Sequence, residues 1–140
     1  LCPDLPSKQQ FNVTAYFRDV WYVVSRFKPQ MRSIKVQDKT VCMKITSQVL
    51  ENGNAREFYT QLKDRMPDSF LETIINPKEF QNGTGKFIAQ MRFVDKEDNT
   101  KHPFYPARTT IIDTDYSNYA VEHMCIPLTK DVRCVYLILT

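Results

Sequence analysis

The chain has 140 residues, of which 42% are hydrophobic and 25% charged, with a formal net charge of +3 and 3 glycines. This length and balance fit one domain with a hydrophobic core, and they exclude disordered and collagenous classes. The positive charge forms no dense basic patch and no apolar run approaches the roughly 20 residues of a membrane helix, so we expect one domain over residues 1–140 that neither binds nucleic acid nor inserts into a membrane.

The predicted elements are short and mostly strand-like. Residues 1–10 hold two prolines and predict an extended arm, and residues 11–17 predict a short helical turn. Eight runs with strand character follow, at residues 18–27, 41–50, 57–62, 70–75, 86–93, 105–112, 119–125 and 133–140. Asn52 and Gly53 predict a hairpin turn, because Asn-Gly accommodates positive φ. This pattern predicts an all-β fold with antiparallel strands, either an up-and-down barrel or a sandwich.

Trp21 is the only tryptophan of the chain and stands near the start of the first strand-like run. A tryptophan at this place can plug one end of a barrel, and the alternative is an ordinary core tryptophan. The segment that decides between these interpretations lies far along the chain, at residues 113–120.

The cysteines and glycosylation sequons indicate an extracellular protein. The four cysteines are Cys2, Cys42, Cys125 and Cys134, which allow three pairings. No C-x-x-C motif occurs and the chain has two histidines, so we expect no metal site. Asn12 and Asn82 each begin an N-glycosylation sequon, and the chain starts at Leu1 without a methionine or a signal-like segment. These features together predict a mature, secreted protein in an oxidising setting.

Two motifs resemble the signatures of the lipocalin family. Residues 19–23, Asp-Val-Trp-Tyr-Val, resemble the first signature, G-x-W-Y-x-V, and residues 113–121, Asp-Thr-Asp-Tyr-Ser-Asn-Tyr-Ala-Val, resemble the second, T-D-Y-x-x-Y-A. The resemblance covers essentially the whole chain and implies an all-β, eight-stranded antiparallel up-and-down β-barrel with a short N-terminal arm. Asp19 stands where the family has glycine, and we expect the family's C-terminal helix to be absent.

A closer resemblance is to salivary lipocalins of blood-feeding triatomine bugs, the nitrophorin and triabin group. Residues 11–23 and 94–101 are similar to that group. Its haem-carrying members ligate iron through a histidine on the third strand, and the position that matches best here is Thr60. Threonine does not ligate haem iron, so the resemblance implies a member without haem, and we expect no cofactor.

The resemblance also implies two disulfide bonds. In this group the N-terminal cysteine pairs with the cysteine after the second signature, which suggests Cys2–Cys125. Cys42 would then pair with Cys134. Such bridges close long loops and would stabilise the fold by roughly a few kcal/mol each.

Alternation along the strands, with the signature tryptophan pointing inward as in the family, assigns an inward face to each strand. The residues that we expect to line a ligand cavity are Val23, Ser25, Phe27, Phe58, Thr60, Phe87, Met91, Phe93, Tyr105, Ala107, Thr109, Glu122, Met124, Val135 and Leu137. This mostly apolar lining with a few hydroxyl groups suits an amphipathic organic ligand. The alternative is that these bulky side chains simply fill the core.

Glu122 is the one carboxylate on an inferred inward face. A buried carboxylate needs a cation or hydrogen-bond donors, or it stays protonated. Glu122 would therefore contact a ligand amine or form a structural pair with a neighbouring arginine or lysine. His123, the next residue, should face outward as an ordinary surface residue.

The loops after the first, third, fifth and seventh strands would ring the open end of a barrel, and they carry more cations than anions. The cations are Arg26, Lys28, Arg32, Lys35, Lys39, Lys63, Arg65, Lys96, Lys101, Arg108, Lys130 and Arg133. A basic rim would attract an anionic ligand and raise its association rate, and the alternative is an ordinary solvated surface. The excess of cations over anions at this rim favours a lipid carboxylate over an amine as the ligand.

The sequence therefore predicts a secreted, monomeric binding protein that is not an enzyme. It would sequester an anionic eicosanoid of the leukotriene or thromboxane type as an anti-haemostatic and anti-inflammatory salivary scavenger. One alternative is a serotonin or histamine binder that uses Glu122, and another is an inhibitor that binds proteins through its surface loops. A lipocalin isomerase is a further class, which would need an unpaired cysteine in the cavity.

Overall fold

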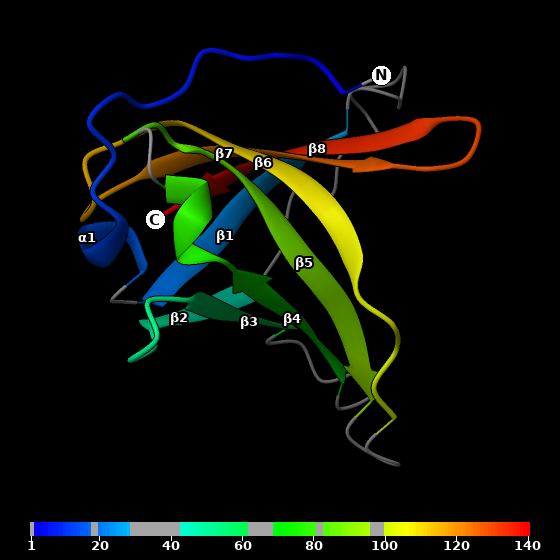
Figure 1. The fold of residues 1–140 in the computed structure, drawn as a ribbon. Helices are drawn as coiled ribbons and strands as arrows, with labels where there is room; N and C mark the ends of the chain where they lie inside the picture. Colours follow the sequence, from blue (N-terminus) through cyan, green and yellow to red (C-terminus); the bar gives the residue numbers. More distant parts are fainter. Residues whose placement is uncertain (1, 18–19, 29–42, 62–68, 81–82, 96–99) are drawn as a thin grey trace.

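The computed structural model describes residues 2–17, 20–28, 43–61, 69–80, 83–95 and 100–140. Its strands are β1 (Val20–Phe27), β2 (Met43–Val49), β3 (Ala55–Gln61), β4 (Ser69–Ile75), β5 (Lys86–Asp95), β6 (Tyr105–Thr114), β7 (Ala120–Pro127) and β8 (Val132–Leu139). Each strand pairs antiparallel with the next, and β8 pairs back to β1, so the sheet closes on itself (Figure 1). The predicted eight-stranded up-and-down barrel is confirmed, and the sandwich is excluded.

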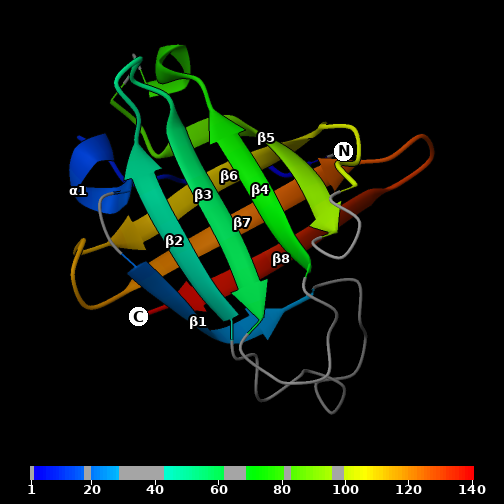
Figure 2. The ribbon, with the colours of Figure 1, turned by 90° about the horizontal axis from the view of Figure 1, so that it is seen from below.

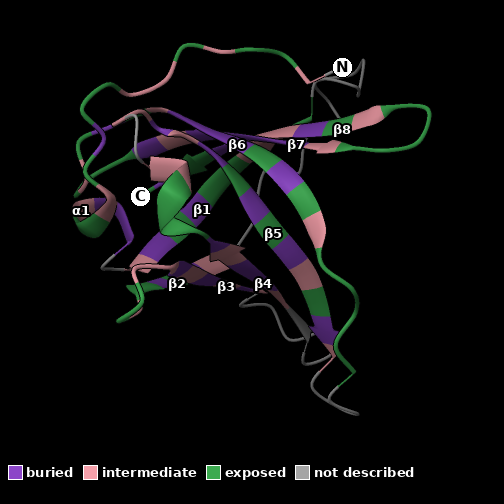
Figure 3. Cartoon of the chain, in the orientation of Figure 1, coloured by how far each residue is buried: buried purple, intermediate pink, exposed green. Residues whose placement is uncertain are grey.

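The barrel is flattened enough to show two crossing layers. Figure 2 shows β2, β3 and β4 running across β6, β7 and β8, with β3 in front of β7. In the closed order β3 and β7 are four strands apart in either direction, so they form opposite walls. Buried and less buried residues alternate along β5, where Phe87, Ala89 and Met91 are buried and Ile88 and Gln90 are exposed (Figure 3).

An aromatic cluster closes one end of the barrel. The helix α1 (Val13–Phe17) begins after Asn12, whose Oδ1 accepts a hydrogen bond from the backbone N–H of Ala15 at 3.0 Å. The indole N–H of Trp21 donates to the backbone carbonyl of Tyr16 at 3.0 Å, and the two rings lie 5.5 Å apart. Trp21 is 3% exposed and belongs to the hydrophobic core, so it is a core residue placed at the closed end.

The N-terminal arm follows the outside of the barrel over β5 and β6 (Figure 1). The backbone N–H of Lys8 donates to the carbonyl of Ile111 at 2.8 Å, and Gly85 donates to the carbonyl of Lys8 at 2.9 Å. An ion pair joins Asp4 to Lys86. A Cβ atom at Gly85 would lie 2.8 Å from the Ile111 carbonyl oxygen, so only glycine allows this close approach.

A β-bulge in β1 changes which side chains point into the barrel after Val23. The register of β1 against β8 shifts between Val23 and Ser25, and beyond the shift Arg26 lies opposite the buried Leu137. Ser25 and Phe27 are exposed on the outer face, where the ring of Phe27 lies 6.0 Å from that of Tyr136. The expectation that Ser25 and Phe27 point into the barrel is therefore wrong.

Along β3, the residues that point into the barrel are also the opposite set from the expected one. The hairpin turn at Gly53, which has a φ of 85°, pairs Ile45 with Tyr59 and Ser47 with Glu57. Because Ile45 and Ser47 are buried on the inward side of β2, Glu57 and Tyr59 are inward too. The residues expected there lie on the outer face. The Arg56 guanidinium covers the ring of Phe58 at 4.5 Å, and Thr60 Oγ1 donates to the Lys44 carbonyl at 3.4 Å.

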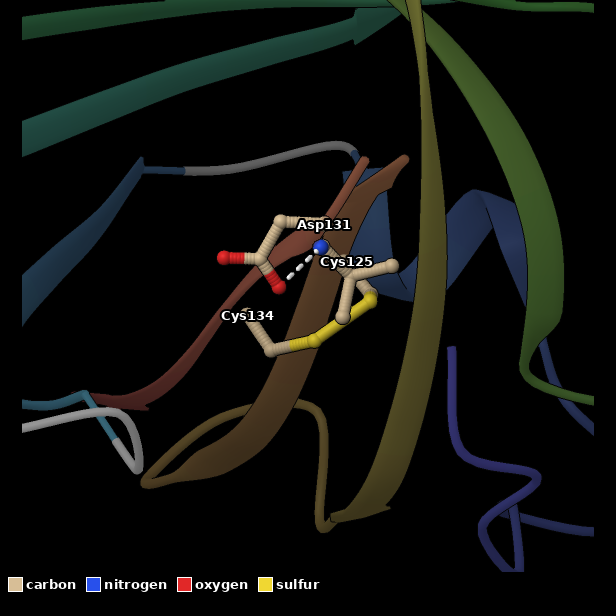
Figure 4. The surroundings of a disulfide bond; sticks show 4 residues. Cys125, Asp131 and Cys134 are labelled. Atoms are coloured by element: carbon tan, nitrogen blue, oxygen red, sulfur yellow. Dashed lines mark hydrogen bonds between the residues drawn. A yellow bond between two sulfur atoms is a disulfide. The ribbon is translucent and has the colours of Figure 1, made fainter. Parts of the chain in front are cut away.

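The disulfide differs from the pairing expected from the family. Cys125 bonds to Cys134 across the β7–β8 hairpin (Figure 4), and Cys2 is free, so the expected Cys2–Cys125 pair is wrong. The expected Cys42–Cys134 pair involves Cys42, which lies outside the described residues. The register places Cys125 directly opposite Cys134, with their Cα atoms 4.1 Å apart. Asn82 also lies outside the described residues, and Asn12 is exposed.

Among the described segments, no helix is both long and apolar enough to cross a membrane.

Candidate ligand-binding site

Most residues expected to line a cavity lie buried or partly buried on the inward face of the barrel. These residues are Val23, Phe87, Met91, Tyr105, Ala107, Thr109, Glu122, Met124, Val135 and Leu137. Phe93 follows the same alternation but is 40% exposed, and its ring lies 5.6 Å from that of His102. Contact between the predicted lining residues and a ligand remains a prediction.

Two carboxylates face each other from opposite walls of the barrel interior. Glu57 lies on β3 and Glu122 on β7, and they are 3% and 2% exposed. The negative charge of Glu122 acts on Glu57, so the two groups lie close enough to interact. The sequence drew attention to Glu122 alone, because Glu57 stands beside Phe58 and was assigned to the outer face.

Hydroxyl groups, rather than cations, surround this pair. The Tyr16 hydroxyl donates to Glu122 Oε2 at 2.9 Å, and the Thr73 hydroxyl donates to Glu57 Oε1 at 3.1 Å. The Tyr59 hydroxyl lies 3.4 Å from Glu57 Oε1. Among the described residues, no lysine, arginine or histidine forms an ion pair with either carboxylate. The structural pair with a cation considered for Glu122 is therefore not formed there.

Burial changes the proton affinity of both groups. Burial, together with the negative charge of Glu122, raises the pKa of Glu57 to about 8, against hydrogen bonds from Thr73 and Tyr59. Burial also raises the pKa of Glu122 to about 7, against hydrogen bonds from Tyr16 and Tyr59. The pair therefore holds about one proton near neutral pH and carries about one negative charge.

A carboxylate on the outer face provides a contrast. Glu72 on β4 accepts hydrogen bonds from Arg56 Nη2 at 2.6 Å and from Arg92 Nε at 2.7 Å. Burial raises the pKa of Glu72, but the hydrogen bonds from Arg92 and Arg56 outweigh it and hold that pKa below its ordinary value. The fold thus compensates this buried carboxylate with cations and leaves the interior pair with hydroxyl groups alone.

A cavity of about 450 Å³ lies at the end of the barrel opposite Trp21. It is lined by Lys28, Ile126, Asp131, Val132, Arg133, Cys134 and Val135. Along β7, Ile126 is four residues beyond Glu122, which corresponds to about 13 Å at about 3.3 Å per residue. Met124, which pairs with the cavity-lining Val135, lies between the cavity and Glu122, and Leu137 lies opposite Glu122 on β8.

The basic rim is only partly described. Lys28 and Arg133 line the cavity, and Lys101 and Lys130 are exposed. Arg108 lies instead on the outer face of β6, at a cavity of about 400 Å³ beside the N-terminal arm. Six predicted rim cations lie outside the described residues, namely Arg32, Lys35, Lys39, Lys63, Arg65 and Lys96.

The closed eight-stranded barrel is a lipocalin fold, a class of barrel whose interior can hold one small ligand. The family model described as Nitrophorin matches residues 2–140, so the chain belongs to the nitrophorin family. No curated protein sequence matches the chain.

Three solved structures share this fold. The tryptamine complex of the amine binding protein of Rhodnius prolixus is 24% identical with a TM-score of 0.81, and the match covers 99% of this chain and 69% of that one. Insecticyanin from the tobacco hornworm Manduca sexta is 15% identical with a TM-score of 0.66, over 99% and 68% of the chains. A mutant of LTBP1 in complex with leukotriene C4 is 14% identical with a TM-score of 0.53, over 92% and 69%.

The interior does not fit a haem group. The two histidines of the chain lie elsewhere, since His102 is exposed and His123 is on the outer face of β7, where it is buried with its ring 4.6 Å from that of Tyr136. The inward phenol on β3 is Tyr59, and burial raises its pKa well above the ordinary value, so it stays neutral and ligates iron poorly. Among the described residues, no group of three metal-binding side chains is present.

Sequence reasoning missed three residues of the site, Glu57, Tyr59 and Tyr16. Glu57 and Tyr59 could have been found by pairing residues across the Asn-Gly turn, because the inward face of the second strand fixes that of the third. His123 was expected at the surface but is buried. Tyr16 carries no sequence signal, because only the docking of α1 brings its hydroxyl to Glu122.

Proposed function

We propose that this protein binds a small amphipathic molecule with a protonated amine inside its barrel. The ammonium group lies between Glu57 and Glu122, and the apolar body extends along Met124 and Val135 toward the open end. The observation that carries this proposal is that Glu57 and Glu122 are both buried and that no described residue forms an ion pair with either.

The physical reason is the cost of burying negative charge. A buried ion without a partner costs several kcal/mol, and an ammonium group from a ligand supplies both the opposite charge and three hydrogen-bond donors. Carboxylate oxygens are acceptors, and donors from Tyr16 and Thr73 occupy one oxygen of each group. Met91 and Met124 can repack around apolar bodies of different shape.

The comparisons are compatible with this ligand class, although at these identities they establish the fold alone. One structural neighbour is an amine binding protein in complex with tryptamine, and a more distant one holds leukotriene C4. Ligand binding without covalent chemistry, a secreted monomeric state and a role as a scavenger in saliva are part of this proposal.

An anionic eicosanoid is the second candidate. It is favoured by Lys28 and Arg133, which line the cavity at the open end and could pair with a lipid carboxylate. It is opposed by the two carboxylates deeper in the barrel, which would repel a carboxylate that entered further.

Titration calorimetry with tryptamine, serotonin, histamine and leukotriene C4 tests the proposal. We expect the amines to bind, and we expect Glu57→Gln and Glu122→Gln each to weaken amine binding at least tenfold, because each removes a carboxylate from the site. Glu51→Gln is the matched control, because Glu51 is exposed in the β2–β3 turn. Leukotriene binding without amine binding would reject the proposal in favour of the second candidate.

A further inference from the structure

We propose that Glu57 and Glu122 act as one proton-sharing unit that accepts a single ammonium group and keeps a single proton. This inference rests on the proposed function and adds its charge stoichiometry and its regulation by pH. In the bound state one carboxylate pairs with the ammonium while the other remains protonated, so the site has no net charge.

The geometry of the pair supports this assignment. Both side chains are almost fully removed from water on facing walls of the barrel, and no described cation pairs with either. A monovalent amine compensates one buried charge, and a second buried charge would be left without a partner. Retaining a proton on the second group avoids that cost.

The other polar groups around the pair do not supply the missing charge. Tyr16 from α1 and Tyr59 from β3 are buried phenols whose pKa values are raised well above the ordinary value, first by burial, so both stay neutral. Ser47 from β2 and Thr73 from β4 carry hydroxyl groups. The inward residues of β5 from Phe87 to Phe93 and of β8 from Val135 to Leu139 are apolar, and the same alternation places Asp95 and Arg133 at the open end. Those of β6 add Thr109 and Tyr105, and burial raises the pKa of Tyr105.

Two described cations lie on inward faces: Arg26, opposite Leu137, and Arg133, opposite Ile126 at the open end, where it lines the cavity. Arg26 has an interaction of its own, and neither arginine forms an ion pair with Glu57 or Glu122. The pair therefore titrates as a unit of two carboxylates among neutral hydroxyl groups.

Proton exchange on binding follows from this stoichiometry. Because the pKa values of the free groups are about 7 and about 8, the free pair holds nearly two protons at pH 6 and nearly none at pH 9. If the bound pair holds one proton, amine binding releases about one proton at pH 6 and takes up about one at pH 9. The exchange passes through zero near pH 7.5.

Calorimetry with tryptamine in phosphate and Tris buffers measures this exchange, because the two buffers have different ionisation enthalpies. We expect release at pH 6, uptake at pH 9, and the same behaviour in Glu51→Gln. Glu57→Gln and Glu122→Gln should abolish the uptake at pH 9, because a single carboxylate needs no retained proton.

The outcomes separate this inference from the proposed function. Tryptamine binding without a reversal of proton exchange would overturn the inference and leave amine binding intact, whereas no amine binding at any pH would overturn both. A comparison at pH 7.5 adds a second criterion. We expect 1,5-diaminopentane to bind at least tenfold more weakly than pentylamine, because its second ammonium would have to displace the retained proton. Tighter binding of the diamine would contradict the inference.

Discussion

At the scale of single residues, the carboxylates of this barrel divide by the partners that the fold gives them. Glu72, on the outer face, has two arginine guanidinium groups, and its pKa is lowered. Glu57 and Glu122 have hydroxyl groups, and burial raises their pKa values. The interior pair therefore destabilises the ligand-free protein when it ionises, as expected of a site that binds a cationic ligand.

This destabilisation should appear in the pH dependence of stability. The folded-state pKa of Glu57 is raised from 4.5 to about 8, so the folded protein holds more protons than the unfolded chain between these pH values. The free energy of unfolding should therefore fall as the pH rises from about 5 to about 8, by an amount on the order of a few kcal/mol at about 1.4 kcal/mol per pKa unit.

Urea denaturation of the ligand-free protein at pH 5 and pH 8.5 measures this effect. We expect Glu57→Gln to be more stable than the wild type at pH 8.5 and to lose much of the pH dependence, while Glu51→Gln follows the wild type. An equal pH dependence in Glu57→Gln and the wild type would show that Glu57 does not ionise with a raised pKa.

At the scale of elements, close backbone contacts fix how each strand presents its side chains. The bulge in β1 turns Arg26 inward and Phe27 outward, and the hairpin turn at Gly53 turns Glu57 inward. The N-terminal arm is held beside β5 and β6 by hydrogen bonds of Lys8 with Ile111 and Gly85, and Gly85 itself approaches Ile111 too closely for a side chain.

Gly85→Ala tests this contact. The added Cβ would lie 2.8 Å from the Ile111 carbonyl oxygen, so we expect a loss of about 1–3 kcal/mol in the free energy of unfolding as the arm or β6 shifts. Urea denaturation measures the loss, and Gln90→Ala, at an exposed position of β5, serves as the control with little change expected. Unchanged stability of Gly85→Ala would mean that Gly85 and Ile111 do not approach this closely.

At the scale of the whole molecule, the barrel connects its closed end to its interior through α1. Tyr16 contacts Trp21 at the closed end, and its hydroxyl group donates a hydrogen bond to Glu122 in the interior. We therefore expect a change at the carboxylate pair to affect the single tryptophan, whereas the cavity lined by Lys28 and Arg133 lies at the opposite end.

Tryptophan fluorescence can thus distinguish the two candidate ligands. A non-absorbing amine such as pentylamine should change the emission of Trp21 with the same midpoint as calorimetry, and Tyr16→Phe should reduce the change, because the contact with Glu122 is lost. A fatty-acid carboxylate bound at the open end should leave the emission unchanged. An amine that binds without any emission change would place its ammonium away from Glu122.

The sequence by itself determined the number of strands, their antiparallel succession, the barrel class and the inward faces of β5 to β8. These properties follow from the alternation of apolar and polar residues, from turn residues and from two motifs, all of which are local features of the sequence. Tertiary structure alone decided that Glu57 faces Glu122, that Tyr16 reaches the pair, that Ser25 and Phe27 face outward, and that Cys125 bonds to Cys134. The physical reason is that a bulge or a one-residue change of register reverses a whole face, and closure of the barrel, rather than any local preference, selects the register.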